Sequence, residues 1–477
     1  MFPAEFVNGL RESLGPERAE RVLAGLAGEP AVSVRVNPFK LTLDSLRAHF
    51  GPLAGEGVAW ASEEGFYLTG RPSFTLDPLF HAGAYYVQEA SSMFAGVLFE
   101  RALGGLGRRT GLRVLDLCAA PGGKTTQLLS HLDDSSLLVA NEVVPARATV
   151  LAENVARWGC PNVAVTQSDP SAFTPLRGFF DVVVVDAPCS GEGMFRKDER
   201  AVAEWSPDNV RLCAARQRRI LADVWPALAS GGFLIYSTCT FNHFEDEDNA
   251  AWMADGLGGE LLEQRHFYPG EDRGEGFYAA LVRKEGMYAA GGVAAGASSS
   301  APGLVTLEKG SLIKVFPAAC VRDLARLEKA LRVIASGTAV ATRKGRDLVP
   351  EADYALSASL RQAVPAAEKG SASLRHVAPA AEKGSASLWH VAPVAEKGSL
   401  RNMPSATLRD LSFETVEISH EEALKFLSRE PLVLPDAPRG YLLLTRKGLG
   451  LGFVKNLGTR TNSLLPATRR IRMTLPS

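Results

Sequence analysis

The stretch VLDLCAAPGGKTTQLL, residues 114–129, decides the fold of the central part of this chain. Its apolar start belongs to a predicted strand over 112–117, and a turn of small residues leads into a predicted helix over 122–132. The alternation continues, with strands expected at 137–142, 163–167, 180–186 and 233–237, and helices at 145–158 and from Pro207 to about 229. This order predicts an α/β domain with a doubly wound, mostly parallel sheet and right-handed crossovers.

The turn after the first strand excludes two common nucleotide-binding motifs. A phosphate-binding loop needs a glycine five residues before Gly123, where this chain has Cys118. A dinucleotide fingerprint needs spaced glycines, whereas Gly122 and Gly123 are adjacent. Small residues at Ala119, Ala120, Gly122 and Gly123 still let a ligand approach the backbone, and the start of the helix offers unpaired N–H groups.

Acidic residues end or follow the later strands of this series. Glu142 ends the second predicted strand, Asp169 lies just past the third, and Asp186 ends the fourth. A carboxylate ending the second strand is suited to bind ribose hydroxyls, and Asp169 could accept a hydrogen bond from an adenine amino group. The ordered set predicts a nucleoside-bearing cofactor without a pyrophosphate, and S-adenosylmethionine fits that description.

Two cysteines follow the last two strands of the series. Cys189 lies in DAPCSGEGMFRKD, residues 186–198, and Cys239 lies in YSTCTF, residues 236–241. Ligands of open α/β sheets bind outside the carboxyl ends of the strands, so thiols at two neighbouring strand ends could reach one substrate. Buried packing is the alternative for any cysteine, but the small polar neighbours Ser190 and Thr238 favour a functional pair.

The composition bounds the class of protein. The chain has 477 residues and six cysteines, without CxxC or metal-ligand spacing, so we predict reduced thiols and no metal site. The start of the chain lacks an apolar signal core, and no apolar run approaches the ~20 residues of a membrane span. We therefore expect a soluble, cytoplasmic protein.

Positive charge is concentrated near the end of the chain. The formal net charge is −1, yet residues 439–477 contain eight basic residues and no acidic one. Such a segment is suited to phosphate contacts, although a solvated basic face is an equally good interpretation of composition alone. The basic residues are Arg439, Arg446, Lys447, Lys455, Arg460, Arg469, Arg470 and Arg472.

Four stretches together resemble the Sun (Fmu) family of RNA cytosine-5 methyltransferases. They are residues 114–129, 186–198 and 236–241, and GEGFYAALVRK at 274–284. The resemblance covers about residues 30–285, and the pairing of PCSGEG with TCT is its most specific part. The segments GEGMFRK and GFVKNLGTRTNSLLPATRRI resemble those of the bacterial RsmF-like branch, which modifies small-subunit ribosomal RNA and carries a PUA-like tail.

The resemblance implies a role for each motif. Cys239 would be the nucleophile, Cys189 would help release the product, and Asp186 would act near nitrogen 3 of the cytosine. A free thiol of pKa ~8.5 is mostly protonated near neutrality, so the site must lower the pKa of Cys239, with Lys124 as a candidate. The family's cofactor site carries over onto Cys118, Ala119, Ala120, Pro121, Gly122, Gly123, Lys124, Glu142, Asp169 and Asp186. The acidic cluster EDEDN at 245–249 departs from the family's usual E-N-E order.

Domain limits follow from motifs and composition. We predict an N-terminal α+β RNA-binding domain over 1–105, a Rossmann-like methyltransferase domain over 106–285 and a flexible linker over 286–303. An accessory segment over 304–356 follows. Tandem copies of a 14-residue repeat, with a proline in each copy, predict disorder over 357–398. A PUA-like RNA-binding α+β domain is expected over 399–477.

Two other functions remain as alternatives. A DNA cytosine-5 methyltransferase would use the cysteine of the PC motif as nucleophile, and the TC cysteine and the basic tail disfavour it. A ribosome-assembly factor that binds RNA without catalysis is disfavoured by the intact cysteines and cofactor loop. We expect a monomer whose partner is ribosomal RNA or the small ribosomal subunit.

Overall fold

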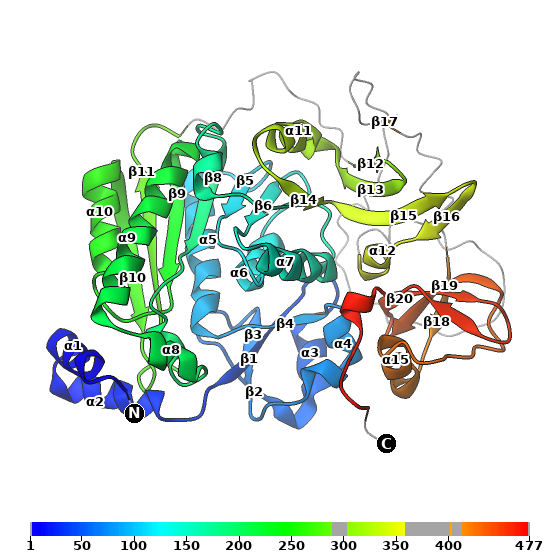
Figure 1. Ribbon diagram of the computed structural model, residues 1–477, viewed down its shortest axis with the longest axis horizontal. Coiled ribbons are helices and arrows are strands. Elements are labelled where there is room, and N and C mark those ends of the chain that lie inside the picture. The colour runs from blue at the N-terminus through cyan, green and yellow to red at the C-terminus, as the bar shows by residue number, and fades with distance from the viewer. Residues whose placement is uncertain (1, 289–302, 358–400, 403–412, 476–477) are drawn as a thin grey trace.

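The computed structural model describes residues 2–288, 303–357, 401–402 and 413–475. Its centre is an eight-stranded sheet of order β10-β11-β9-β8-β5-β6-β7-β14 (Figure 1). Strands β9, β8, β5, β6 and β7 pair in parallel, and β11, β10 and β14 extend the two edges in antiparallel fashion. The strands are β5 Arg113–Asp116, β6 Leu137–Asn141, β7 Val163–Thr166, β8 Phe180–Asp186, β9 Leu228–Thr238, β10 Gly259–Phe267, β11 Phe277–Lys284 and β14 Val333–Ser336.

Helices cover both faces of this sheet, as a doubly wound fold requires. On one face, α5 (Phe94–Leu106), α6 (Gly123–Ser130) and α7 (Pro145–Trp158) pack on residues such as Val114 and Val184. On the other, α9 (Pro207–Val224), α10 (Glu247–Leu257) and α11 (Val321–Ala330) pack on residues such as Leu115 and Val183. The chain runs from β5 outward to β7 and then returns to β8 on the other side of β5, so the connections change direction beside β5. The expected fold class is confirmed.

One predicted boundary is wrong. The helix expected to reach about residue 229 ends at Val224, and β9 begins at Leu228 instead of residue 233. Pro226 lacks the N–H group that would continue the helix, and a short 3-10 turn over Trp225–Ala227 follows instead. Gly231 and Gly232 then lie inside β9, where the pairing with β8 shifts register.

The N-terminal part forms a second sheet of order β2-β3-β1-β4. Its helices α1 and α2 lie apart from that sheet, and they pack on Phe195, Phe241 and Tyr268 of the central domain. The predicted limit at residue 105 would assign almost all of α5 to the N-terminal domain. The apolar face of α5, however, packs in the core of the central sheet. The elements are α1 Ala4–Leu14, α2 Pro16–Leu26, β1 Val32–Val36, α3 Leu43–Phe50, β2 Ala54–Gly57, β3 Gly65–Leu68, α4 Pro78–His81 and β4 Tyr85–Val87.

The C-terminal part contributes two further sheets, of orders β16-β15-β13-β12-β17 and β18-β19-β20-β21. The second sheet and helix α15 share an apolar core with the N-terminal sheet, in which Phe50 and Phe426 both lie. Within the described residues no helix is long and apolar enough to cross a membrane. The repeats after residue 357 and most of the linker lie outside the described residues. The elements are β12 Leu304–Lys309, β13 Leu312–Pro317, β15 Thr338–Lys344, β16 Asp347–Pro350, α12 Ala352–Leu356, β17 Arg401–Asn402, β18 Glu414–Glu417, α15 His420–Leu427, β19 Gly440–Arg446, β20 Leu449–Asn456 and β21 Thr461–Ser463.

Candidate active site

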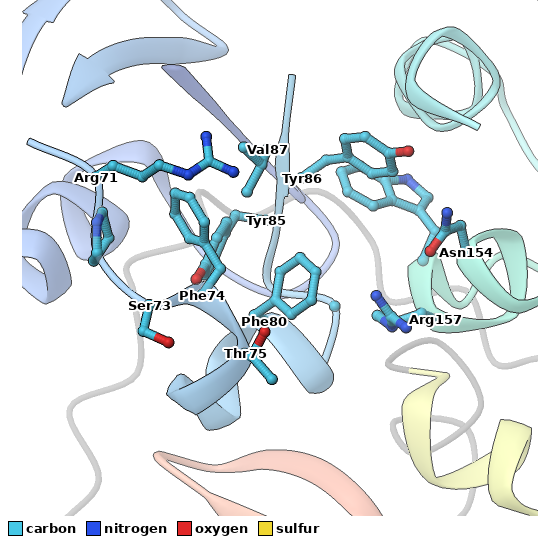
Figure 2. A pocket seen from close by; sticks show the side chains of 13 residues that line it. Arg71, Ser73, Phe74, Thr75, Phe80, Tyr85, Tyr86, Val87, Asn154 and Arg157 are labelled. Carbon is cyan, nitrogen blue, oxygen red and sulfur yellow. The ribbon is translucent and has the colours of Figure 1, made fainter. Parts of the chain in front are cut away.

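A cleft of about 1330 Å³ opens at the carboxyl ends of β5 and β8, where the connections change direction. Ligands of open α/β sheets bind at such a point. Its wall combines the loop after β5, the two strand-end carboxylates Asp116 and Asp186, Cys239, and residues of the N-terminal sheet such as Tyr86. A second cavity of about 460 Å³ adjoins the cleft and lies between the N-terminal sheet and α7 (Figure 2).

The loop after β5 presents its backbone to the cleft, as the sequence predicts. Cys118, Ala119, Ala120, Pro121, Gly123 and Lys124 all line the cleft. Gly122 has φ +115°, a conformation that favours glycine, and it begins α6. Side chains of α7 hold the loop from behind, because Arg147 donates to the carbonyl of Ala120 at 2.9 Å and Asn154 to that of Pro121 at 2.7 Å. Burial raises the pKa of the Cys118 thiol well above its usual range, which fits an inert packing role.

Asp116, at the end of β5, is a site residue that the sequence argument missed. Its carboxyl is fully buried and accepts a hydrogen bond from Thr125 Oγ1 at 2.6 Å, while Oδ1 has no partner among the described residues. Burial raises the pKa of Asp116 to about 7. The signal was present, since Asp116 ends the first strand as Glu142 and Asp186 end later strands.

Glu142 and Asp169 lie at the same edge of the sheet as the loop, but neither lines the cleft itself. The buried Glu142 carboxylate accepts a hydrogen bond from the Val144 N–H at 2.9 Å and pairs with Arg147 at 3.3 Å. Asp169 caps a short turn, with its Oδ1 accepting hydrogen bonds from the backbone and hydroxyl of Ser171. Their assignment to the nucleoside half of a cofactor stays a prediction.

The two cysteines meet. β8 and β9 are neighbours, and Cys189 and Cys239 follow them with their sulfur atoms 3.1 Å apart. The Cys239 backbone N–H also donates to the Cys189 sulfur at 3.4 Å. The pKa of Cys189 is raised, first by the hydrogen bond with the Cys239 thiol and then by burial. Cys189 therefore keeps its proton and can donate it to the Cys239 sulfur.

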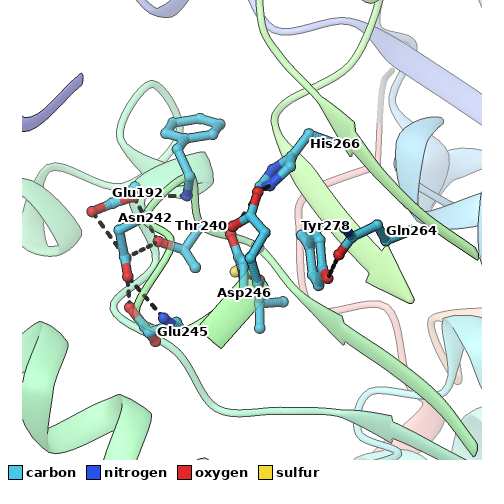
Figure 3. A network of polar contacts seen from close by, with 12 residues as sticks. Glu192, Thr240, Asn242, Glu245, Asp246, Gln264, His266 and Tyr278 are labelled. Atoms are coloured by element: carbon cyan, nitrogen blue, oxygen red, sulfur yellow. Dashed lines mark hydrogen bonds and ion pairs between the residues drawn. The ribbon is translucent and has the colours of Figure 1, made fainter. Parts of the chain in front are cut away.

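A buried network fixes the two cysteine loops (Figure 3). Glu192, which lies three residues after Cys189, accepts hydrogen bonds from Thr240 Oγ1 at 2.6 Å and from the Phe241 N–H at 2.7 Å. Glu245 accepts a hydrogen bond from the Ser190 N–H at 3.0 Å. The loop after β8 thus supplies the Glu192 carboxylate to the loop after β9, and the loop after β9 supplies the Glu245 carboxylate in return. Glu245 belongs to the acidic cluster at 245–249, so this bond gives that residue of the cluster a structural role.

A second polar group lies beside this network, and Figure 3 labels its members Asp246 and His266. Asp246, Glu247 and His266 place possible metal-ligand atoms within 4.8 Å of one another, where sequence spacing predicted no metal site. His266 and Glu247 share a hydrogen bond of 2.7 Å, and Asp246 accepts one from Thr238. His266 Nδ1 also lies 3.9 Å from Asp246 Oδ2, and the bond from Thr238 ties the residue before Cys239 to the start of α10.

Lys124 takes a different partner from the one expected. Its ammonium lies 2.9 Å from Asp186 Oδ2, and the other oxygen of Asp186 accepts a hydrogen bond from Ser237 Oγ at 2.7 Å. Within the described residues, neither a hydrogen bond nor an ion pair joins Lys124 to Cys239. Arg196, in the same loop as Cys189, pairs with Glu275 and donates hydrogen bonds to three backbone carbonyls.

Three family models match consecutive parts of the chain. The N-terminal domain of 16S rRNA methyltransferase RsmF matches residues 2–90, 16S rRNA methyltransferase RsmB/F matches 106–283, and the methyltransferase RsmF PUA domain matches 413–471. The chain belongs to the RsmF branch of the RsmB/F family. The predicted family is therefore confirmed, whereas the predicted domain limits and the RNA-binding role of the N-terminal domain stay predictions.

Curated members of the RsmF branch are similar to part of this chain. The ribosomal RNA small subunit methyltransferase F of Pectobacterium carotovorum is 34% identical over 312 residues, which cover 59% of this chain and 63% of that protein. The ribosomal RNA small subunit methyltransferase F of Shewanella amazonensis is 33% identical over 305 residues, which cover 59% of this chain and 64% of that protein. The matched part thus spans less than two thirds of these relatives.

Solved structures share the fold. A methyltransferase homolog protein from Pyrococcus horikoshii aligns with a TM-score of 0.52 and 30% identity, over 59% of this chain and 95% of the other. NSun6 from Pyrococcus horikoshii, solved with SFG, aligns with a TM-score of 0.52 and 20% identity, over 60% of this chain and 99% of the other. At 20% identity the second likeness concerns the fold alone.

Proposed function

We propose that this protein transfers a methyl group from S-adenosylmethionine to carbon 5 of a cytosine in RNA, and that its substrate is 16S ribosomal RNA. The observation that carries the proposal is the pair of sulfur atoms 3.1 Å apart, one of which lines the same cleft as the loop after β5. Two free thiols beside a ligand-binding loop suit a reaction that adds a thiolate to a substrate and later removes it.

The residues of the cleft fit S-adenosylmethionine. The unpartnered Asp116 Oδ1 is a buried acceptor for a cationic amino group, and the start of α6 offers N–H groups to a carboxylate. Loop residues 118–124 would lie along the cofactor, Glu142 would hold the ribose and Asp169 the adenine. When bound, S-adenosylmethionine supplies the methyl group as an electrophile.

Cys239 is the proposed nucleophile. Its thiolate forms a bond to carbon 6 of the cytosine, the 5,6 double bond opens, and carbon 5 becomes nucleophilic enough to take the methyl group. Negative charge that would build up on the ring is offset by a proton at nitrogen 3. The Lys124–Asp186 pair at 2.9 Å is the proposed source of that proton.

Cys189 is the proposed release group. Carbon 5 must lose its proton before the bond between carbon 6 and Cys239 can break and restore the double bond. The strongest cause of the raised pKa of Cys189 is its hydrogen bond with the Cys239 thiol, and that bond is lost once the Cys239 sulfur is bonded to carbon 6. The Cys189 thiol, 3.1 Å from Cys239, then passes its own proton to solvent, and the resulting thiolate takes the proton from carbon 5.

The names of the relatives and the tail support RNA over DNA. The matched family models and curated relatives are named for 16S or small-subunit ribosomal RNA, and the third matched domain is a PUA domain. A DNA enzyme would use Cys189 as nucleophile, yet Cys239 is the cysteine that lines the cleft. A ribosomal RNA substrate would place the activity in the cytoplasm.

Mapping of methylated cytosines tests this function. Purified protein, 16S ribosomal RNA and labelled S-adenosylmethionine should yield 5-methylcytosine, detected by nuclease digestion and mass spectrometry and located by bisulfite sequencing. Cys239→Ser should yield none, because a serine hydroxyl is too weak an acid to replace the thiolate. Methylation at ring nitrogens or at ribose, or equal activity of Cys239→Ser, would rule out the proposed reaction.

A further inference from the structure

The cavity beside the cleft combines aromatic rings with positive charge (Figure 2). Its volume of about 460 Å³ lies in the range of small-molecule sites. No acidic residue lines it within the described part of the chain. The lining residues are Arg71, Pro72, Ser73, Phe74, Thr75, Phe80, Gly83, Tyr85, Tyr86, Val87, Asn154, Arg157 and Trp158.

Two arginines of this cavity have no anionic partner among the described residues. In the part of the chain that the structure describes, neither the Arg71 nor the Arg157 guanidinium makes a hydrogen bond or an ion pair, and each lies over an aromatic ring. Arg71 lies 5.7 Å from the centroid of Phe74, and Arg157 lies 5.0 Å from that of Phe80. Guanidinium groups bind phosphate through paired hydrogen bonds, so the cavity is suited to a phosphate group.

The rings and polar groups suit a nucleobase. Phe74, Phe80 and Tyr86 are partly exposed, and bases stack on such rings irrespective of their sequence. Trp158 is 2% exposed, and its indole N–H has no partner among the described residues. The Tyr86 hydroxyl also makes no hydrogen bond within those residues. The cavity therefore offers stacking surfaces, unsatisfied polar groups and positive charge together.

The cavity is continuous with the cleft. Arg71, Tyr86 and Val87 line both, and Tyr86 lies against Gly123 of the loop after β5. Asn154 lines the cavity and also holds the carbonyl of Pro121 at 2.7 Å. An RNA strand with its target base in the cleft would thus meet the cavity with a neighbouring nucleotide.

We infer that this cavity binds a nucleotide of the substrate RNA next to the target cytosine, stacking its base on Phe74, Phe80 and Tyr86 and holding phosphate with Arg71 and Arg157. The inference rests on the proposed function, because it assigns the cavity to the same RNA. It adds a site that selects and orients the strand, separate from the thiols and from the cofactor residues.

Charge and stacking can be tested separately. The probe is single-stranded RNA that carries the target cytosine with its flanking sequence, and binding is measured over a range of salt concentrations. Arg71→Gln/Arg157→Gln should weaken binding about tenfold or more, and should flatten the slope of log affinity against log salt by ~0.7 for one phosphate or ~1.4 for two. Phe80→Leu, which keeps apolar packing, should weaken binding about five- to 150-fold without changing the slope.

A matched control removes charge elsewhere. Arg322 is exposed on α11, lines neither cavity, and makes no hydrogen bond or ion pair within the described residues, so Arg322→Gln should bind RNA like the unaltered protein. All variants should keep the cofactor dissociation constant, which also shows that they are folded. A photoreactive uridine beside the target cytosine should cross-link within residues 71–87 or 154–158.

The outcomes separate this inference from the proposed function. If the unaltered protein fails to methylate the RNA, the proposed function fails. If it methylates the RNA while the double arginine variant keeps full affinity and slope, the inference alone is wrong. Cross-links confined to other segments, or a mononucleotide that occupies the cavity without competing with RNA, would also overturn it.

Discussion

Asp116 shows how a single buried carboxyl can couple the site to pH. It is fully buried at the end of β5, lines the cleft, and has one oxygen without a partner among the described residues. Burial raises its pKa to about 7, so the group is partly protonated near neutrality. A cationic ligand beside it would favour the carboxylate and release the proton.

Cofactor affinity should therefore rise with pH up to about 7 and then level off, because Asp116 must lose its proton on binding. Calorimetry in two buffers with different ionisation enthalpies should detect proton release below that pH. Asp116→Asn should bind the cofactor about ten- to a hundredfold more weakly, and its affinity should not change over this range. The same pH dependence in Asp116→Asn would show that another group is responsible.

The same shift affects stability in the free protein. A carboxyl whose pKa is higher in the folded than in the unfolded state stabilises the fold while it is protonated. The stabilisation from Asp116 is therefore complete below pH 3.8, the unfolded pKa, and is lost as the pH rises through about 7, the folded pKa. Asp116→Asn cannot ionise. Its unfolding free energy, taken relative to that of the unaltered protein, should therefore be about 4 kcal/mol higher at pH 8 than at pH 4. Denaturant titrations at the two pH values measure this, and an unchanged difference would contradict the assignment.

Glu142 is the second residue whose role can be measured directly. If it holds the ribose, Glu142→Ala removes a charge-assisted hydrogen bond worth roughly 1.5 to 3 kcal/mol, and cofactor affinity should fall about ten- to a hundredfold. RNA affinity should stay the same. Because Glu142 also accepts a hydrogen bond from Val144, Glu142→Gln serves as a control that keeps an acceptor in place. An unchanged cofactor dissociation constant in Glu142→Ala would remove Glu142 from the site.

At the scale of elements, the site depends on how two strand ends are held together. The loops after β8 and β9 exchange hydrogen bonds through Glu192 and Glu245, and these bonds lie in the interior. Sequence reasoning placed both cysteines at neighbouring strand ends, because strand order in a doubly wound sheet follows from the alternation of elements. It missed the end of α9, since glycines at 231–232 look like a helix stop although Pro226 ends the helix earlier.

Glu192→Gln should loosen the loop that carries Cys239. Glu192 Oε2 now accepts the bonds from Thr240 and Phe241, and Oε1 accepts one from Trp205 Nε1. In either orientation the amide group of the glutamine would therefore face a donor. Leaving a buried donor unsatisfied costs about 1 to 3 kcal/mol, so the unfolding free energy should fall by that amount. Methyl transfer should fall more steeply than cofactor affinity, which calorimetry measures independently. A variant with full activity and full stability would mean that this network does not position Cys239.

At the scale of the whole molecule, the domains are not independent units. The sheet β18-β19-β20-β21 shares one apolar core with the N-terminal sheet, and Arg469 of the tail pairs with Asp353 of the preceding unit. Local patterns could predict the α/β series and the short strands of the tail. They could not predict these contacts, because residues such as Phe50 and Phe426 lie far apart in sequence. The apolar pattern around each residue is equally compatible with two domains that have separate cores.

Removal of residues 413–477 should therefore destabilise the protein instead of only weakening RNA binding. The truncation would expose buried side chains of the N-terminal part, including Leu46 and Phe50 of α3. Each large buried side chain is worth about 1.5 to 3 kcal/mol. A thermal unfolding scan of the truncated protein should show an earlier transition. An unchanged midpoint would mean that the shared core contributes little.

Charge substitution tests the RNA role of the tail without that loss. Lys447, Lys455 and Arg460 are exposed, whereas Arg469 is held by Asp353. The triple change Lys447→Gln/Lys455→Gln/Arg460→Gln should flatten the salt dependence of RNA binding by about two units if all three meet phosphates. Cofactor affinity should not change. Full salt dependence in the triple variant would move the RNA contacts away from this sheet.

The central claim is that Cys239 attacks the RNA and Cys189 releases it, and a covalent complex reports on both at once. Each variant is incubated with RNA and S-adenosylmethionine and then separated under denaturing conditions. Cys189→Ala should accumulate a protein–RNA complex that survives denaturation, because addition proceeds while elimination fails. Cys239→Ala, and the variant lacking both thiols, should form none. A complex that forms with Cys239→Ala and not with Cys189→Ala would reverse the two roles and contradict the account.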